Sequence, residues 1–365
     1  MKRILTMIII AGMVAGLTAC GSKASSNTAS DPSGSGEEAT GDTADAGSLD
    51  EIIIVLPRSA ECLDDVDFVV ADEIGYFKEN GISVTFEEAS GTSDMTMVSM
   101  GKGDICFPDP DVFLIGIESN LNVKAFYQRD TIAENCLVVN SDSDIKELKD
   151  IAGHSIAVGD ASWSACINPV LIAAGVDPDS VEYVVAGDDR AQMVISGKVD
   201  SAFSWEKGYQ LWQAEGLDIR PISFSDYVEV PGNPLVATTD CINNNKDVLT
   251  RFCKALAEAE YFVTCNPEAA TKIVMERFPS IEVEEEDAVE VINAAIKLWS
   301  SADGFEENGY GYINTEAWED CIKYAKEAGV ITKEYSVSDL YTDEFVKGAN
   351  NFDKASVKAD AEGYK

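Results

Sequence analysis

Apolar and polar positions change period along the chain, starting near Ile52. Short apolar runs between turn residues predict strands, and longer stretches with helical spacing predict helices. Strands are expected at 52–56, 82–86, 105–107 and 123–127, with helices at 66–77, 92–101 and 112–118 between them. A second series of the same kind runs from His154 to about Ile222. This alternation predicts an α/β fold, with helices packed on sheets.

The pattern becomes purely helical beyond Asn243. Pro267 and Pro279 are placed as helix starts and stops. The spacing predicts helices over 246–265, 268–278, 284–301 and 315–328. A helical C-terminal part therefore follows the two α/β series.

An internal repeat relates the two series. Residues 91–107 align without gaps on residues 187–203, at an offset of 96, and 7 of the 17 pairs are identical. Each copy reads as a Gly turn, a helix, a Gly-Lys-x-Asp turn and a strand, although common α/β turn chemistry is an alternative source of the match. The repeat predicts two similar lobes, with a ligand site in the cleft where the parallel strands end.

The amino-terminal residues have the pattern of a bacterial export signal. Lys2 and Arg3 precede an apolar run that is short for a bilayer span, and Leu17-Thr18-Ala19 directly precedes Cys20, which resembles a lipobox. We expect a signal peptide at 1–19, a lipid on Cys20 and a disordered tether to residue 48. The protein is then extracytoplasmic and lipid-anchored to the bacterial cell membrane.

Charge and composition exclude several function classes. Against 27 Lys and Arg stand 65 Asp and Glu, a formal net charge of -38 that repels nucleic acid. The single histidine, His154, disfavours histidine zinc sites and Ser-His-Asp triads, so no metal and no cofactor are expected. Eight cysteines remain after Cys20. Disulfides and free thiols are both open for them.

Four segments resemble a known family: "VVADEIGYFKENGISVTFEEASG", "MVSMGKGDICF", "SDIKELKDIAGHSIAV" and "MVISGKVDSAF". They are similar to solute-binding proteins of ABC importers for aliphatic sulfonates, taurine, nitrate and thiamine-type pyrimidines. The resemblance covers about 52–341 and implies a periplasmic-binding-protein-like Venus-flytrap, a non-enzymatic monomer that delivers a small solute to a permease. It implies crossovers near 131–135 and 234–238, and helices of the C-terminal part packed on the first lobe. Lobe 1 is then 49–132 plus 236–365, and lobe 2 is 133–235.

Loops after the expected strands supply the candidate ligand-binding side chains. Trp163 and Trp205 follow strands of the second series, where they can stack on a planar ring or an alkyl chain, with core packing as the alternative. The carboxylates of these loops are opposed only by Arg58, which favours an amino-bearing or N-heterocyclic solute over a bare anion. A taurine or alkanesulfonate importer subunit is the alternative, and a secreted enzyme is a minor one. The full candidate set is Arg58, Ser59, Ser90, Thr92, Asp109, Asp160, Ser162, Trp163, Trp205 and Glu206.

Overall fold

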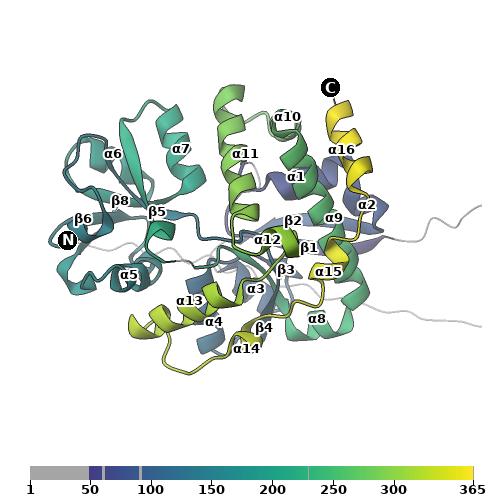
Figure 1. The fold of residues 1–365 in the computed structure, drawn as a ribbon, viewed down its shortest axis with the longest axis horizontal. Helices are drawn as coiled ribbons and strands as arrows, with labels where there is room; N and C mark the ends of the chain where they lie inside the picture. The colour runs from purple at the N-terminus through teal and green to yellow at the C-terminus, as the bar shows by residue number, and fades with distance from the viewer. Residues whose placement is uncertain (1–48, 60–61, 90–92, 229, 365) are drawn as a thin grey trace, which may run out of the picture. The chain divides into compact units, whose positions relative to one another are not determined.

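The computed structural model describes residues 49–364 except 60–61, 90–92 and 229 (Figure 1). The predicted signal peptide, Cys20 and the tether lie outside the described residues. Within the described part, no helix is both long and apolar enough to span a bilayer. The described residues from 49 onward belong to one compact unit.

The first sheet has five strands in the order β2-β1-β3-β10-β4. Strand β1 is parallel to β2 and β3, and β10 is antiparallel to β3 and β4. Along β1, Ile54 and Val55 face opposite apolar clusters, so both faces of the sheet are covered. The strands are β1 (Asp50–Leu56), β2 (Ile82–Glu88), β3 (Ile105–Cys106), β4 (Val123–Gln128) and β10 (Pro234–Thr238).

The second sheet repeats this arrangement in the order β7-β6-β8-β5-β9. Strand β6 is parallel to β7 and β8, and β5 is antiparallel to β8 and β9. In each sheet the fourth position is therefore held by the antiparallel strand that follows a crossover from the other sheet. The strands are β5 (Asn135–Asn140), β6 (Ser155–Val158), β7 (Glu182–Val185), β8 (Ser201–Trp205) and β9 (Ile219–Ser223).

The repeat found in the sequence has matching local structure in the two sheets. Helix α3 (Asp94–Ser99) and helix α6 (Arg190–Ile195) start 96 residues apart, and each is followed by a left-handed glycine, Gly101 with φ 69° and Gly197 with φ 66°. Asp104 then accepts the backbone N–H of Ile53 at 2.8 Å, as Asp200 accepts that of Ser155. The Gly-Lys-x-Asp turn thus ties the strand that follows it to β1 in the first sheet and to β6 in the second.

Two crossovers connect the sheets, and they hydrogen-bond to each other. Gly232 N donates to Asp130 O at 3.0 Å, and Asp130 N donates to Asn233 O at 3.2 Å. A Cβ on Gly232 would lie 2.4 Å from the carbonyl oxygen of Ile132, so only glycine fits here. The first crossing, 129–134, agrees with the expected position. The second crossover was expected near 234–238, but it precedes these residues, because Pro234–Thr238 is itself strand β10 of the first sheet.

Helices of the C-terminal part pack on the first sheet, which confirms the prediction. Helices α9, α10 and α16 group with α1 on one face (Figure 1). The helix expected over 66–77 is divided at Gly75, which ends α1. The main helices not yet bounded are α1 (Val66–Ile74), α2 (Tyr76–Glu79), α4 (Pro110–Glu118), α5 (Ser164–Ala173), α7 (Glu206–Ala214), α8 (Thr239–Asn244), α9 (Lys246–Cys265), α10 (Pro267–Arg277), α11 (Glu285–Ser300) and α13 (Thr315–Glu327). The remaining ones are α12 (Phe305–Asn308), α14 (Val337–Leu340) and α15 (Val346–Ala349), each of four residues, and α16 (Lys354–Gly363) of ten.

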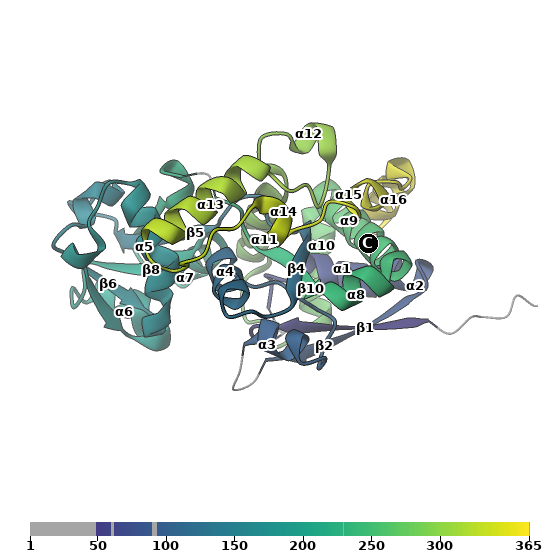
Figure 2. The same cartoon turned by 90° about the horizontal axis from the view of Figure 1, so that it is seen from below.

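Helices from the two sheets also touch directly. Helix α13 packs against α5 and α4, and α11 packs against α7 (Figure 2). Helices α4, α11 and α13 belong with the first sheet, and α5 and α7 with the second. These contacts flank the space between the two sheets. The eight described cysteines are all unbridged, and five of them are buried: Cys106, Cys136, Cys166, Cys253 and Cys321.

Candidate functional site

A cavity of about 290 Å³ lies between the two sheets. From the first sheet, Arg58 follows β1, Asp109 follows β3 and Arg129 follows β4. From the second sheet, Trp205 ends β8, and Trp163 lies in the short 3-10 helix that follows β6. The residues that form the cavity wall therefore lie at the carboxyl ends of strands in both sheets, where the loops and helices that follow these strands meet.

Aromatic side chains form the wall on the side of the second sheet. The Trp163 ring meets Phe203 edge to face, with 5.5 Å between centroids. Arg190 is 4% exposed, and its guanidinium lies 4.7 Å from the Trp163 ring and 5.9 Å from the Trp205 ring. Arg190 also donates to the carbonyl oxygens of Phe203 and Gly187. This buried cation positions both tryptophans, and both line the cavity.

A buried ion-pair network forms the wall on the side of the first sheet. Arg129 donates to both carboxylate oxygens of Asp67, at 2.7 and 2.6 Å, and its guanidinium lies 4.8 Å from the Phe107 ring. Burial alone would lower the pKa of Arg129, but Asp67, Asp130 and Asp65 together outweigh burial and hold the pKa well above its usual value. Arg58 pairs with Asp64 and Asp65, at 3.1 and 3.2 Å. Both guanidinium groups are thus already matched to carboxylates of this protein.

A third buried cation, Lys207, comes from the first turn of α7. Its Nζ lies 3.5 Å from Glu134, and the side chain is 2% exposed. Burial opposes the charged form of Lys207, but Glu134, Asp64 and Asp130 outweigh burial and raise its pKa. For Glu134, burial outweighs the attraction of Lys207 and raises the pKa to about 7. Glu134 is therefore only partly ionised at neutral pH.

Four polar atoms in this wall have no hydrogen-bond partner among the described residues. Three are carboxylate oxygens, Asp94 Oδ2, Asp130 Oδ1 and Glu134 Oε2, and the fourth is the donor Arg58 Nε. All four residues line the cavity. Burial raises the pKa of Asp94 to about 6, and its other oxygen accepts Met95 N–H at 2.7 Å. Buried polar atoms without a hydrogen-bond partner cost free energy of folding, so we expect these four atoms to form hydrogen bonds with a ligand in the cavity.

Four of the ten predicted ligand-binding residues line the cavity: Arg58, Asp109, Trp163 and Trp205. Four others do not: Ser59, Asp160, Ser162 and Glu206. Asp160 accepts the backbone N–H of Ser162 at 2.9 Å as a cap, and both residues are exposed. Glu206 accepts hydrogen bonds from Tyr209 and Gln210 on its own helix. Ser90 and Thr92 lie outside the described residues.

Several wall residues were missed by the sequence analysis. Arg129, Asp130 and Glu134 belong to the first crossover, and Lys207 and Asp94 to the first turns of helices. The expectation that only Arg58 opposes the carboxylates is wrong, because Arg129 and Lys207 line the same cavity. One signal was present in the sequence: Arg129 and Asp130 closely follow the strand that was expected over 123–127.

Comparisons with known proteins agree with this architecture. The family model described as NMT1/THI5 like matches residues 65–270. A riboflavin-binding protein, RibY of Chloroflexus aurantiacus, is 20% identical over 297 residues, which cover 78% of this chain and 82% of RibY.

Solved structures with the same fold include binding proteins and enzymes. The periplasmic aliphatic sulphonate binding protein SsuA of Escherichia coli superposes with a TM-score of 0.63 at 14% identity, covering 82% of this chain and all of SsuA. The desulfurization enzyme DSZB superposes with a TM-score of 0.56 at 15% identity, covering 83% of this chain and 99% of DSZB. At these identities the likeness establishes the fold and leaves the ligand open.

Proposed function

The chain belongs to the NMT1/THI5 like family, and from this premise we propose that it is the extracytoplasmic solute-binding subunit of an ABC importer. It captures a small amino-bearing or N-heterocyclic solute between two lobes and delivers it to a permease. Lobe 1 is 49–132 plus 234–365 and lobe 2 is 133–233, which corrects the expected boundary at 235, because β10 pairs with strands of the first sheet. The solute-binding relatives and the cavity between two like sheets support this role. The lipidated Cys20 holds the protein at the membrane, as the Leu17-Thr18-Ala19-Cys20 motif supports.

The unpaired carboxylate oxygens of Asp94, Asp130 and Glu134 carry the proposal for the solute. A carboxylate accepts hydrogen bonds, so these atoms favour a ligand with N–H groups, and Arg58 Nε favours one acceptor on the same ligand. Trp163 and Trp205 supply apolar faces on the opposite wall. A flat heterocycle that carries both N–H donors and carbonyl acceptors satisfies all of these groups.

A taurine or alkanesulfonate solute is the second candidate. Three cations line the cavity, and the solved structure of SsuA is that of a sulphonate-binding protein. However, Arg58, Arg129 and Lys207 are each already paired with carboxylates of this chain. A sulfonate would therefore have to compete with Asp64, Asp67 and Glu134, whereas an N–H donor meets free acceptors. Taurine, which carries an amine, fits better than a simple alkanesulfonate.

A thermal-shift screen tests the proposed function. Pyrimidines, flavins, taurine, alkanesulfonates, amino acids and polyamines are added separately to the purified protein. A ligand that binds only the folded state at 100 times its Kd stabilises it by about 2.7 kcal/mol, so we expect a clear rise in Tm with an N-heterocycle or amine. A rise with simple alkanesulfonates alone would reverse the order of the two candidates. Chemical turnover of a stabilising ligand would instead favour an enzyme.

Solute affinity should increase as the pH rises through 7. Glu134 has a folded pKa of about 7, and only its ionised form accepts an N–H bond at both oxygens. One such group makes binding about tenfold weaker at pH 6 than at pH 8. Glu134→Gln should remove this step and leave the dependence on Asp94, whose pKa is about 6, and on Asp130, whose pKa burial also raises. Calorimetric titration of the hit from the screen over pH 5 to 8 measures both curves.

The stability of the ligand-free protein should change in the opposite direction. The pKa of Glu134 is raised in the folded state, so its contribution to stability is complete below its ordinary pKa and is lost as the pH rises through 7. Affinity and stability that both rise with pH would contradict the assignment of Glu134 to the solute site.

Cys20→Ser should release the protein from membranes. In this proposal the lipid on Cys20 supplies the anchor, because a strongly acidic protein is not attracted to anionic lipid headgroups. Fractionation of cells that express each form measures the effect. Lys23→Ser, three residues away, is the control and should stay in the membrane fraction. A Cys20→Ser protein that remains there would exclude the lipoprotein assignment.

A further inference from the structure

A second, much smaller cavity of about 20 Å³ adjoins the main one. Its wall contains Asp109 and Asp111 at the start of α4, Cys166 on α5 and Cys321 on α13. Asp109 and Cys166 also line the main cavity. A space of this volume holds about one water molecule or one ion. Two carboxylates and two thiols therefore surround a site for a single small occupant.

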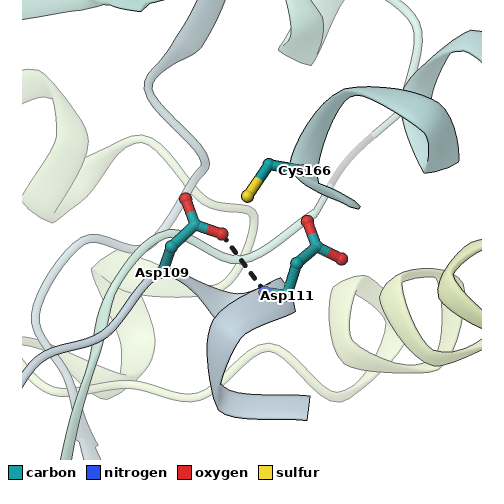
Figure 3. A group of neighbouring side chains, drawn as sticks. All are labelled: Asp109, Asp111 and Cys166. Atoms are coloured by element: carbon teal, nitrogen blue, oxygen red, sulfur yellow. Dashed lines mark hydrogen bonds between the residues drawn. The ribbon is translucent and has the colours of Figure 1, made fainter. Parts of the chain in front are cut away.

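The donor atoms of Asp109, Asp111 and Cys166 all lie within 4.8 Å of one another. Figure 3 shows the Cys166 sulfur directed toward the two carboxylates. Asp109 uses one oxygen to accept Asp111 N–H at 3.1 Å and the other to accept the Asn135 side chain at 3.1 Å. The Asp111 carboxylate has no hydrogen-bond partner within the described part of the chain.

This cluster has no counter-charge. Across residues 49–364, gaps apart, neither Asp109 nor Asp111 forms an ion pair within 4.0 Å. Asp109 and Asp111 are each only partly exposed, and two adjacent carboxylates in such a place are unfavourable unless a cation or a proton compensates them.

The cysteines provide a second, independent observation. Cys166 is 8% exposed and Cys321 is 4% exposed, so both thiols are more than nine-tenths buried. The Cys321 thiol has no hydrogen-bond partner among the described residues, although it faces the same small cavity. Both cysteines belong to apolar clusters, Cys321 to one on the first sheet and Cys166 to one on the second, and the Cys166 thiol hydrogen-bonds to Asp109. The small cavity is where these two cysteines meet the two aspartates.

We propose that Asp109, Asp111 and Cys166 bind one divalent transition-metal ion of the zinc class. A thiolate among the ligands selects Zn²⁺ or Co²⁺ over Mg²⁺ and Ca²⁺, which prefer oxygen alone. Two carboxylates and one thiolate supply three of the four ligands that zinc prefers, and no histidine is needed. Cys321 borders the same small cavity but lies outside the group of donor atoms within 4.8 Å of one another. Binding displaces the thiol proton of Cys166 to solvent.

The ion would join the two sheets. Asp109 and Asp111 precede and begin α4 beside the first sheet, whereas Cys166 lies on α5 beside the second. Metal binding therefore favours the packed arrangement of these helices. Because Asp109 also lines the main cavity, occupancy of the metal site changes the charge that a solute meets there.

Cobalt titration of the full chain tests the proposal. The protein is stripped with a chelator, kept reduced with a phosphine and titrated with Co²⁺. We expect one equivalent to bind with the absorption of thiolate-to-cobalt charge transfer, and Zn²⁺ to displace it. Cys166→Ser should abolish this absorption. Asp111→Asn should weaken Co²⁺ binding about 100-fold or more, since loss of outer-sphere partners alone costs 10- to 100-fold.

Two control variants distinguish Co²⁺ binding at this site from non-specific Co²⁺ binding to the acidic surface. Cys253→Ser removes a buried thiol on α9, and Asp188→Asn removes an exposed carboxylate; both should bind Co²⁺ like the unmodified protein. Asp111 is partly exposed, so Asp111→Asn provides a test even if Cys166→Ser unfolds. Absence of the charge-transfer absorption, equal binding by Asp111→Asn, or a Cys166–Cys321 disulfide in the purified protein would each overturn the proposal.

Discussion

Arg129→Leu should destabilise the protein by about 3 to 5 kcal/mol, the cost of breaking a buried ion pair by removing one partner. Arg129 is 2% exposed, and it donates to both oxygens of Asp67, which is fully buried. Without the guanidinium, the Asp67 carboxylate keeps its burial and loses its cation. Urea unfolding followed by tryptophan fluorescence measures the change in the free energy of unfolding.

A double variant tests the physical reason. Arg129→Leu combined with Asp67→Leu removes both charges, so it should recover a large part of the lost stability. Arg251→Leu is the control for a partly exposed pair. Arg251 is 28% exposed, pairs with the exposed carboxylates of Asp50 and Asp247 and also donates to the carbonyl oxygen of Asn80, and ion pairs of this kind contribute about 0 to 1 kcal/mol. An Arg129→Leu protein no less stable than Arg251→Leu would show that the network does not stabilise the fold.

Trp163→Ala and Trp205→Ala should each weaken solute binding by about 10- to 100-fold. Both side chains line the cavity. Each substitution removes ring stacking worth about 0.5 to 1.5 kcal/mol and, in addition, the apolar surface of the solute that the tryptophan covers. At 1.4 kcal/mol per factor of ten, this sum gives the expected range. Calorimetry with the hit from the thermal-shift screen measures Kd, and the same samples give Tm.

Trp212→Ala is the matched control for these variants. The Trp212 ring lies 5.6 Å from the same Arg190 guanidinium, but Trp212 does not line the cavity. Its loss should lower Tm, because a cavity opens in the second sheet's packing, and should leave Kd unchanged. If Trp163→Ala and Trp205→Ala behave like Trp212→Ala, with lower Tm and equal affinity, both tryptophans are packing residues.

Local sequence patterns predicted the elements well because burial and turn chemistry are local. The helix at 246–265 is α9 to the residue, and the repeat at an offset of 96 matches equivalent turns, helices and strands. The same patterns could not show that β10 returns to the first sheet from a distant part of the sequence. That pairing depends on contacts far apart in the chain.

The cavity wall was harder to predict for a different reason. Strand-end loops pointed to Asp109, which lines the cavity, and to Asp160, which does not, although both cap the helix that follows them. The local sequence cannot show which of the two faces the cavity, because each makes the same capping bond to the backbone N–H two residues later. Lys207 was missed because a lysine is almost never buried unless it is paired, and its partner Glu134 lies 73 positions earlier in the sequence.

The paired crossovers give the molecule a mechanical constraint. The two crossover segments are hydrogen-bonded to each other through Asp130 and Gly232, so we expect them to bend together as one hinge. Thr131 fixes one end of this hinge by donating its N–H and its hydroxyl to the carbonyl oxygen of Leu298, both at 2.7 Å. Asp130 belongs to the hinge and also has an unpaired carboxylate oxygen at the cavity. A solute that hydrogen-bonds to Asp130 therefore contacts the hinge directly, so the same residue affects both the affinity for the solute and the flexibility of the hinge.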